Sequence, residues 1–425
     1  MERFALSRMK EWKENENRKP LIIRGARQVG KTWIMKTFGQ QYFEKTAYVN
    51  FDNNARMKQV FEGDLDIERL VLAISAETGV SIEAENTLII FDEVQEVPKA
   101  LTSLKYFYEN APQYAIVAAG SLLGVALHQG TSFPVGKVDF LDLYPLNFRE
   151  FLCAMGEKQF VSMLDSCDTQ MVTVFKTKYI ERLREYYFVG GMPEVVKDFS
   201  EKKDYNRVRA IQKNLINYYQ QDFSKHAEIK LVPRLNLVWN SIPMQLAKEN
   251  KKYIYGQVRE GSRAKDFELA IQWLLDCGLI HKVQRIQKPD LPLKAYIDFD
   301  AFKLFLVDIG LLIAMTDLDA KVIIEGNKIF TEFNGSLTEQ YILQQLISDV
   351  GVIPYYYSTQ NSKGEIDFLV QGKTSVIPIE VKAEENLKAK SLKAFCEKYQ
   401  PSYAVRTSMS DYREQDWMTN IPLYA

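Results

Sequence analysis

The chain has few of the residues that build metal centres and disulfide frameworks. Its 425 residues include only 4 cysteines and 3 histidines. The cysteines are scattered without a C-x-x-C pair, and the histidines lie far apart in the sequence. Structural zinc sites and disulfide scaffolds both need such residues at close spacings. We therefore expect neither kind of site.

Net charge and long apolar runs are also lacking. The formal net charge is −1, so a nucleic-acid surface would have to be a local patch. The longest apolar stretches, residues 114–127 and 302–315, are short for a membrane span, and the second contains Lys303 and Asp308. The first residues are charged, without a signal-peptide core. We expect no membrane association and a cytoplasmic location.

What is present indicates a globular α/β protein of several domains. Hydrophobic residues make up 46% of the chain and charged residues 26%. Short apolar runs and helical stretches alternate over residues 1–150, which predicts a parallel sheet. We further expect a helical linker or lid region at 151–230, a winged-helix-like domain at 231–320 and a second α/β domain at 321–425.

A complete phosphate-binding loop pattern follows the first predicted strand. Residues 25–32 read GARQVGKT, which fills every fixed position of G-x-x-x-x-G-K-[ST]. In this pattern backbone N–H groups surround the phosphates and the next helix adds its positive N-terminal end. Lys31 contacts the terminal phosphates, and the Thr32 hydroxyl ligates Mg²⁺. The predicted nucleotide-binding residues are Gly25, Ala26, Arg27, Gln28, Val29, Gly30, Lys31 and Thr32.

A second apolar strand ends in two carboxylates. Residues 88–91 are followed by Asp92 and Glu93, as in a buried parallel strand that delivers acids at its C-terminal edge. We expect Asp92 to hold Mg²⁺ and Glu93 to polarise the water that attacks the γ-phosphate. No N-K-x-D motif is present, which favours ATP over GTP. The pattern predicts Mg²⁺-dependent ATP hydrolysis with Lys31 and Glu93 as catalytic residues.

Two residues near this site each have two interpretations. Ser121 follows the predicted strand 114–119, where it is placed to sense the γ-phosphate, although an ordinary Gly-Ser loop explains it equally well. Arg149 follows the last predicted strand, 138–143, and suits either an arginine finger or a structural ion pair. The sequence does not choose between these interpretations.

The middle region has the element order of a winged helix-turn-helix. A helix at 238–248, a short strand at 251–255, a helix near 267–275 and a strand at 278–283 are predicted. Six basic residues crowd this stretch: Lys248, Lys251, Lys252, Arg259, Arg263 and Lys265. They suit a phosphate-contacting patch or a solvated surface that packs on the ATPase domain as a lid.

Two predicted strands near the C-terminus bring carboxylates together. Period-two alternation places Asp367 opposite the apolar face of the strand 365–370. The same reading puts Glu380 and Lys382 on one face of the strand 377–382, and residues 371–374 form a hairpin turn between the strands. Glu339 lies on, or at the edge of, the apolar face of a helix at 337–346, which would be costly without a partner.

This D…E-x-K arrangement resembles the PD-(D/E)xK nuclease superfamily, including its helical glutamate. Asp367 and Glu380 suit an Mg²⁺ site, beside which water could be activated for phosphodiester attack. The resemblance implies nuclease roles for Asp367, Glu380, Lys382 and Glu339. The sequence departs from the pattern in having Ile366 where the motif has proline. Nuclease-fold domains also persist as inactive binding modules.

The chain as a whole resembles prokaryotic AAA+-superfamily ATPases that carry a C-terminal domain of unknown function with a restriction-endonuclease-like fold. The strings that carry the resemblance are GARQVGKT, IIFDEVQ, YPLNFREF, GGMPEVV, FKLFLVDIGLL, GEIDFLV and IPIEVKA. The resemblance implies binding and hydrolysis of ATP. AAA+ relatives often form rings, which implies a homo-oligomer.

Two classes of function stay open. The first is an ATP-driven enzyme that acts on DNA or RNA through a nuclease centre. The second is an ATP-dependent switch or scaffold whose C-terminal domain binds a protein or nucleic-acid partner.

Overall fold

The structure is a computed structural model that describes residues 2–120, 124, 134–248, 251–324, 331–359, 364–383 and 389–425, with only the backbone at 331–334. The chain divides into two compact units. The N-terminal unit contains residues 2–144 together with 276–278, and the C-terminal unit contains 145–275 and 279–425. Ser121 lies outside the described residues, so its predicted role as a sensor stays a prediction.

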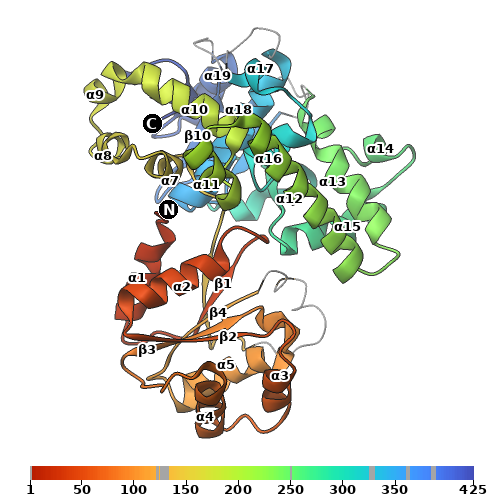
Figure 1. Ribbon diagram of the computed structural model, residues 1–425. Coiled ribbons are helices and arrows are strands. Elements are labelled where there is room, and N and C mark those ends of the chain that lie inside the picture. Colours follow the sequence, from red (N-terminus) through yellow and green to blue (C-terminus); the bar gives the residue numbers. More distant parts are fainter. Residues whose placement is uncertain are drawn as a thin grey trace. The chain divides into compact units, whose positions relative to one another are not determined.

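The N-terminal unit is built on a five-stranded sheet in the order β2-β3-β4-β1-β5 (Figure 1). Its strands are β1 (Leu21–Arg24), β2 (Lys45–Asn50), β3 (Thr87–Asp92), β4 (Ala115–Ala119) and β5 (Asp139–Asp142). Every pairing between them is parallel, which confirms the predicted parallel sheet. All the strands therefore end at the same edge, where β4 lies between β1 and β3.

Helices cover both faces of this sheet. Figure 1 shows α1 (Ala5–Glu14) and α2 (Lys31–Tyr42) on one face, and α3 (Ala55–Glu62), α4 (Ile67–Thr78) and α5 (Pro98–Asn110) on the other. Alternate strand residues, such as Val49, Ile89, Phe91 and Ile116, form one buried cluster with residues of α3, α4 and α5. Because neighbouring strand residues point to opposite faces, their continuous apolar runs match a sheet buried on both sides.

The C-terminal unit begins with a helical stretch. Its helices are α7 (Phe148–Ala154), α8 (Lys158–Asp165), α9 (Thr169–Val174), α10 (Lys176–Val189), α11 (Pro193–Lys202), α12 (Tyr205–His226), α13 (Val232–Leu246), α14 (Tyr255–Val258), α15 (Ala264–Asp276), α16 (Ile309–Met315), α17 (Ala320–Ile324), α18 (Thr331–Gln345) and α19 (Lys390–Tyr399). Phe223 of α12 packs edge-on against Trp239 of α13 and Trp273 of α15. In the described part of the chain, no helix is long and apolar enough to cross a membrane.

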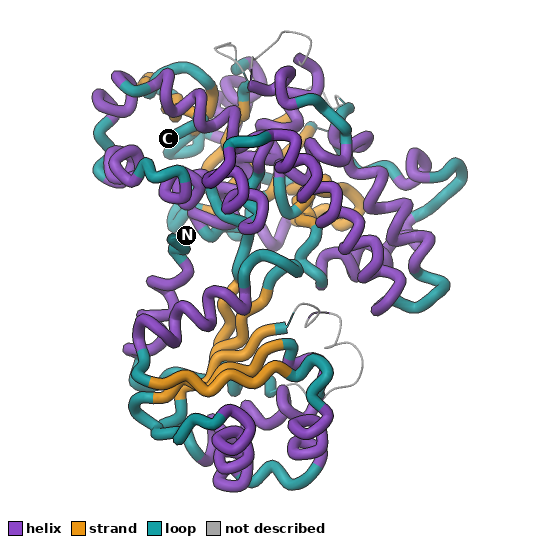
Figure 2. The backbone as a smooth tube through the Cα atoms, in the orientation of Figure 1, coloured by secondary structure: helices purple, strands orange, loops and turns teal. Residues whose placement is uncertain are grey.

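An eight-stranded sheet forms the second half of this unit, in the order β12-β13-β11-β10-β9-β8-β6-β7. Its strands are β6 (Ile280–Ile286), β7 (Ile297–Leu306), β8 (Tyr355–Ser358), β9 (Glu365–Gln371), β10 (Val376–Val381), β11 (Val405–Ser408), β12 (Arg413–Gln415) and β13 (Met418–Pro422). Strands β9 and β10 are antiparallel, which confirms the predicted hairpin. Figure 2 shows these strands in orange among the helices.

One predicted strand of the middle region is absent. Residues 251–255 form no strand, and the backbone N–H of Tyr253 donates a single hydrogen bond to the Phe302 carbonyl, 2.8 Å away. The strand predicted after the helix near 267–275 is β6, which pairs with β7 in an antiparallel hairpin but also joins β8 through a parallel pairing. The winged-helix interpretation and the bounds of the four predicted domains stay predictions.

A buried carboxylate ties three helical segments of the C-terminal unit together. Asp308 accepts hydrogen bonds from the backbone of Gly191 at 2.6 Å and of Leu311, in α16, at 3.0 Å. A Cβ atom at Gly190 would collide with the Asp308 carboxylate, so the GGMP turn needs its glycine there. The side-chain amide of Gln344, in α18, also donates a hydrogen bond to Asp308, at 3.4 Å. Burial raises the pKa of Asp308 to about 6.

Candidate functional site

The phosphate-binding loop connects β1 to α2 in an unusual backbone conformation. Gly25, Gln28 and Gly30 have φ values of 149°, 66° and 96°. A Cβ atom at Gly25 would collide with the Leu143 carbonyl oxygen, so only glycine fits there. No side chain caps the first turn of α2, which leaves its backbone N–H groups available to phosphate oxygens.

Lys31 lies inside this loop. Its side chain is buried, and its Nζ donates hydrogen bonds to the carbonyl oxygens of Gly25 at 2.9 Å and Ala26 at 2.8 Å. Burial lowers the pKa of Lys31 to about 8, against the opposing charges of Glu93 and Asp92. The loop therefore holds a desolvated ammonium group whose strongest possible partner is an anion.

The two halves of the predicted magnesium site are in contact. Thr32 Oγ1, in the first turn of α2, donates to Asp92 Oδ2 at 2.6 Å, although β4 separates β3, which ends at Asp92, from β1, which leads into the loop. Tyr48 of β2 donates to the same carboxylate oxygen at 2.9 Å. Burial and the Asp92 charge raise the pKa of Tyr48, so its hydroxyl stays protonated and remains a donor. A hydroxyl and a carboxylate are oxygen ligands that suit Mg²⁺.

Glu93 turns the chain sharply at the end of β3. Its φ of 51° lies in the left-handed region, and a 3₁₀ helix, η1 (Val94–Glu96), follows at once. The Glu93 backbone N–H donates to Asp92 Oδ1 at 3.1 Å, which fixes the start of the turn. Gln95 Nε2 donates to Glu93 Oε2 at 2.7 Å. The carboxylate predicted to act as a base is therefore held by the turn that presents it.

Arg149 has ion-pair partners within the C-terminal unit. Its guanidinium contacts Asp165 and also lies 3.3 Å from Asp349. These contacts are those of a structural ion pair, one of the two interpretations that the sequence left open.

The C-terminal constellation is larger than the sequence predicted. Glu339 of α18 is buried and pairs with Lys251 and with Lys303, whose Nζ lies 3.4 Å from it. Lys303 of β7 is fully buried and also lies 2.5 Å from Glu365 of β9. Burial opposes ionisation of Glu339, but the two lysines prevail and hold its pKa well below the usual range. Lys251 therefore points inward and does not belong to a solvent-facing basic patch.

The predicted face of β9 and β10 carries the remaining members. Asp367 Oδ2 accepts a hydrogen bond from the Val381 backbone N–H at 2.7 Å, and Lys382 pairs with Glu380 at 2.7 Å. Burial raises the pKa of Asp367, and so do the charges of Glu339 and Glu380. Burial likewise raises the pKa of Glu380, whose Oε2 is buried without a hydrogen-bond partner among the described residues. The structure thus brings together all four residues that the sequence predicted.

A divalent cation does not fit this cluster as it is arranged. Within the described ranges, no three Asp, Glu, His or Cys side chains are grouped so that they could hold a metal ion. Two lysines of the chain itself, Lys251 and Lys303, already supply the positive charge that faces Glu339. Four carboxylates lie among three lysines here: Glu339, Glu365, Asp367 and Glu380 with Lys251, Lys303 and Lys382.

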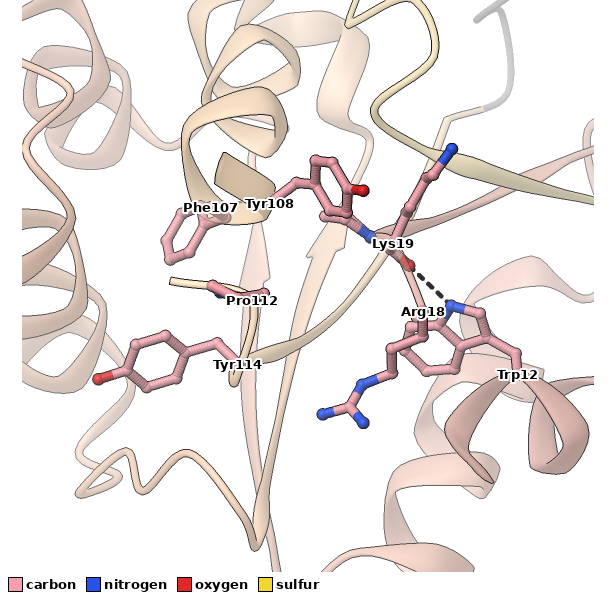
Figure 3. Close-up of a pocket in the computed structure, with 8 residues that line it drawn as sticks. Trp12, Arg18, Lys19, Phe107, Tyr108, Pro112 and Tyr114 are labelled. Carbon is pink, nitrogen blue, oxygen red and sulfur yellow. Dashed lines mark hydrogen bonds between the residues drawn. The ribbon is translucent and has the colours of Figure 1, made fainter. Parts of the chain in front are cut away.

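A shallow hollow of the N-terminal unit lies away from the phosphate loop. Figure 3 shows it lined by Trp12, Arg18 and Lys19 and by aromatic and proline residues around α5. Trp12 Nε1 donates to the Lys19 carbonyl at 2.7 Å along its side. Residues 18–20 precede β1, and residues 112–114 precede β4. The hollow is therefore at the amino ends of the strands, opposite the edge that carries Lys31 and Asp92.

Three regions of the chain match known protein families. Residues 17–152 match a family described as an AAA domain. Residues 180–322 match a domain of unknown function (DUF8612), and residues 334–425 match another (DUF4143). Among curated proteins, none matches the chain. With the loop, the sheet and the acids in place, the N-terminal unit is a P-loop ATPase domain of the AAA type.

Distant likenesses to solved structures extend over much of the chain. The Walker-type ATPase PABY2304 of Pyrococcus abyssi is 15% identical, with 74% of this chain and 95% of that chain covered and a TM-score of 0.45. The Aeropyrum pernix ORC1 protein, solved in complex with DNA, is 13% identical over 73% and 91%, with a TM-score of 0.27. The RuvB Holliday junction branch migration motor of Thermotoga maritima is 11% identical over 65% and 87%, with a TM-score of 0.28.

Proposed function

We propose that the chain is a Mg²⁺-dependent ATPase whose N-terminal unit acts as a switch for the C-terminal unit. The observation that carries the ATPase assignment is the 2.6 Å contact of Thr32 with Asp92. It joins the residue that follows the loop lysine to the carboxylate that ends β3. Oxygen ligands from both halves of the predicted site therefore meet at one point of the sheet edge.

Each residue of the site has a separate role in hydrolysis. Lys31 exchanges the carbonyls of Gly25 and Ala26 for phosphate oxygens, and the first turn of α2 adds backbone N–H donors. Thr32 and Asp92 would hold Mg²⁺, which supplies charge neutralisation at the phosphates. Glu93 accepts the proton of the attacking water.

Substitution of these residues tests the assignment. We expect Lys31→Ala to abolish ATP binding, and Glu93→Gln to bind ATP while hydrolysing it at least about a hundredfold more slowly. The measurements are the dissociation constant for ATP and the rate of phosphate release. Lys10→Ala, in an exposed ion pair of α1, and Glu96→Gln, in the turn η1, serve as matched controls. Turnover of Glu93→Gln at the wild-type rate would remove Glu93 from the mechanism.

For the C-terminal unit we propose a restriction-endonuclease-like fold that is used for binding a partner. The pairing of Glu339 with Lys251 and Lys303 supports this, because it commits the helical glutamate to internal cations. A nuclease centre at Asp367, Glu380 and Lys382 is the second candidate. It is favoured by the buried Oε2 of Glu380, which has no hydrogen-bond partner among the described residues, and by the proximity of Glu380 to Asp367, whose pKa its charge raises.

One set of assays separates these two functions. ATP hydrolysis and substrate integrity are followed together with single-stranded DNA, double-stranded DNA and RNA, in Mg²⁺ and in Mn²⁺. A binding role predicts that no ligand is cleaved, and that stimulation of hydrolysis by one of them identifies the partner class. Cleavage that disappears in Asp367→Ala protein would establish the nuclease instead. No response to any nucleic acid would indicate a protein partner.

A further inference from the structure

We propose that Gln95 is a positioning residue for ATP hydrolysis, which holds the Glu93 carboxylate in the orientation that activates water. The inference rests on the proposed ATPase function and adds a residue to it. Its basis is the hydrogen bond from Gln95 Nε2 to Glu93 Oε2, at 2.7 Å.

The backbone at Glu93 has a strained conformation that sets the position of the main chain but not that of the carboxylate. A left-handed conformation is unfavourable for a residue with a side chain, and Glu93 adopts one with a φ of 51°. The turn is closed by the Glu96 N–H, which donates to the Glu93 carbonyl at 3.0 Å, and it places Gln95 two residues beyond the carboxylate. The strained turn thus sets the main chain, and the Gln95 side chain sets the carboxylate.

An amide is chemically suited to this task. It donates a hydrogen bond without carrying charge, so it orients the carboxylate without neutralising it as a lysine or an arginine would. One carboxylate oxygen, Oε2, is engaged in this way. The other end of the amide, Gln95 Oε1, is buried and accepts no hydrogen bond from the described part of the chain.

The carboxylate that Gln95 holds belongs to the residue after Asp92, whose side chain contacts Thr32 at the end of the phosphate loop. Burial lowers the pKa of Lys31, and among the charges that oppose this shift Glu93 acts more strongly than Asp92. Both carboxylates are thus close enough to the loop lysine for their charges to act on it.

The test replaces Gln95 by alanine and by methionine, which keeps the length of the side chain but removes the donor. We expect kcat to fall about 10- to 100-fold in both variants, as for a misplaced catalytic group, with the dissociation constant for ATP within about twofold of wild type. In Glu93→Gln protein, the same changes at position 95 are expected to lower kcat by less than about twofold, because the group that Gln95 positions is already lost. Glu96→Ala, in the same turn, is the control.

The outcomes separate this inference from the function on which it rests. Wild-type kcat in Gln95→Met protein would overturn it, and so would a full loss of rate when the change is made in Glu93→Gln protein. An equal loss of ATP affinity or thermal stability would show a merely structural role. If Glu93→Gln protein turns over at the wild-type rate, the assignment of the base fails instead.

Discussion

ATP affinity should fall as pH rises through the pKa of Lys31. Burial lowers this pKa from its ordinary value of 10.5 to about 8 in the nucleotide-free protein. The shift corresponds to about 3 kcal/mol disfavouring the charged ammonium. Bound phosphates restore the missing counter-charge, so we expect the pKa in the complex to return to the ordinary value or above. The complex therefore holds a proton that the free protein has lost above pH 8.

The size of the effect follows from this difference. Affinity should be constant below about pH 8 and then weaken about tenfold per pH unit, up to about 300-fold in all. Between pH 7.5 and 9.5 the dissociation constant should rise about 25-fold. Over this range the triphosphate is already fully ionised, so its own titration does not contribute.

The assay is equilibrium binding of ATP and Mg²⁺ at several pH values, by calorimetry in buffers of different ionisation enthalpy. Uptake of about one proton per ATP is expected above pH 8. Lys31→Arg should remove the slope, because a guanidinium stays charged over the range. The charge of the Cys277 thiol also acts on Lys31, so Cys277→Ser serves as a control variant. It should keep the same pH dependence of the dissociation constant as wild type. A dissociation constant that does not change between pH 7.5 and 9.5 would refute the reasoning, and so would an equal slope in Lys31→Arg protein.

Two further predictions concern the C-terminal unit. Burial raises the pKa of Asp308 from 3.8 to about 6, so the folded state holds its proton over a pH range in which the unfolded state has lost it. The protonated Asp308 therefore makes its whole contribution to the free energy of unfolding below about pH 4. This contribution, about 3 kcal/mol, is lost as pH rises through 6. The difference in urea stability between wild type and Asp308→Asn should follow that curve, and a constant difference would contradict it. Lys303→Met should destabilise the protein by about 3–5 kcal/mol, because the buried Glu339 and the half-buried Glu365 lose their shared cation. Exposed Lys294→Met is the control, and a loss below about 1 kcal/mol for Lys303→Met would refute the role of this lysine.

Much of the nucleotide site could be predicted because its chemistry is local in the sequence. The loop at 25–32 and the acids after β3 each occupy one short string, and a parallel sheet brings the ends of such strands together. The roles of Tyr48 and Gln95 were missed. Tyr48 acts across a strand pairing, and Gln95 acts through a left-handed turn, which no pattern of apolar residues indicates. The final residue of the string IIFDEVQ was nevertheless a signal for the second.

The pairing of buried charges in the C-terminal unit could not be predicted from the sequence. Lys303 and Asp308 were noticed only as charges that interrupt an apolar stretch. Their partners, Glu339, Glu365 and Gly191, are far from them in the sequence, so local periodicity does not show the pairing. The strand predicted at 251–255 failed for a related reason. Its composition suits a strand, but only one backbone hydrogen bond reaches it from β7.

The eight-stranded sheet affects whether the two segments that form it can be separated during evolution. Strands β6 and β7 lie within the segment that matches one family, at 180–322, whereas β8 to β13 lie within the segment that matches another, at 334–425. The parallel pairing of β6 with β8 crosses the border between them. A truncated chain that kept only one of the two segments would expose an edge strand with unpaired backbone N–H and C=O groups. Such an edge can pair with other chains and cause aggregation. A gene fragment cut between the two would also separate Lys303 from Glu339, so we expect the segments to be gained and lost together.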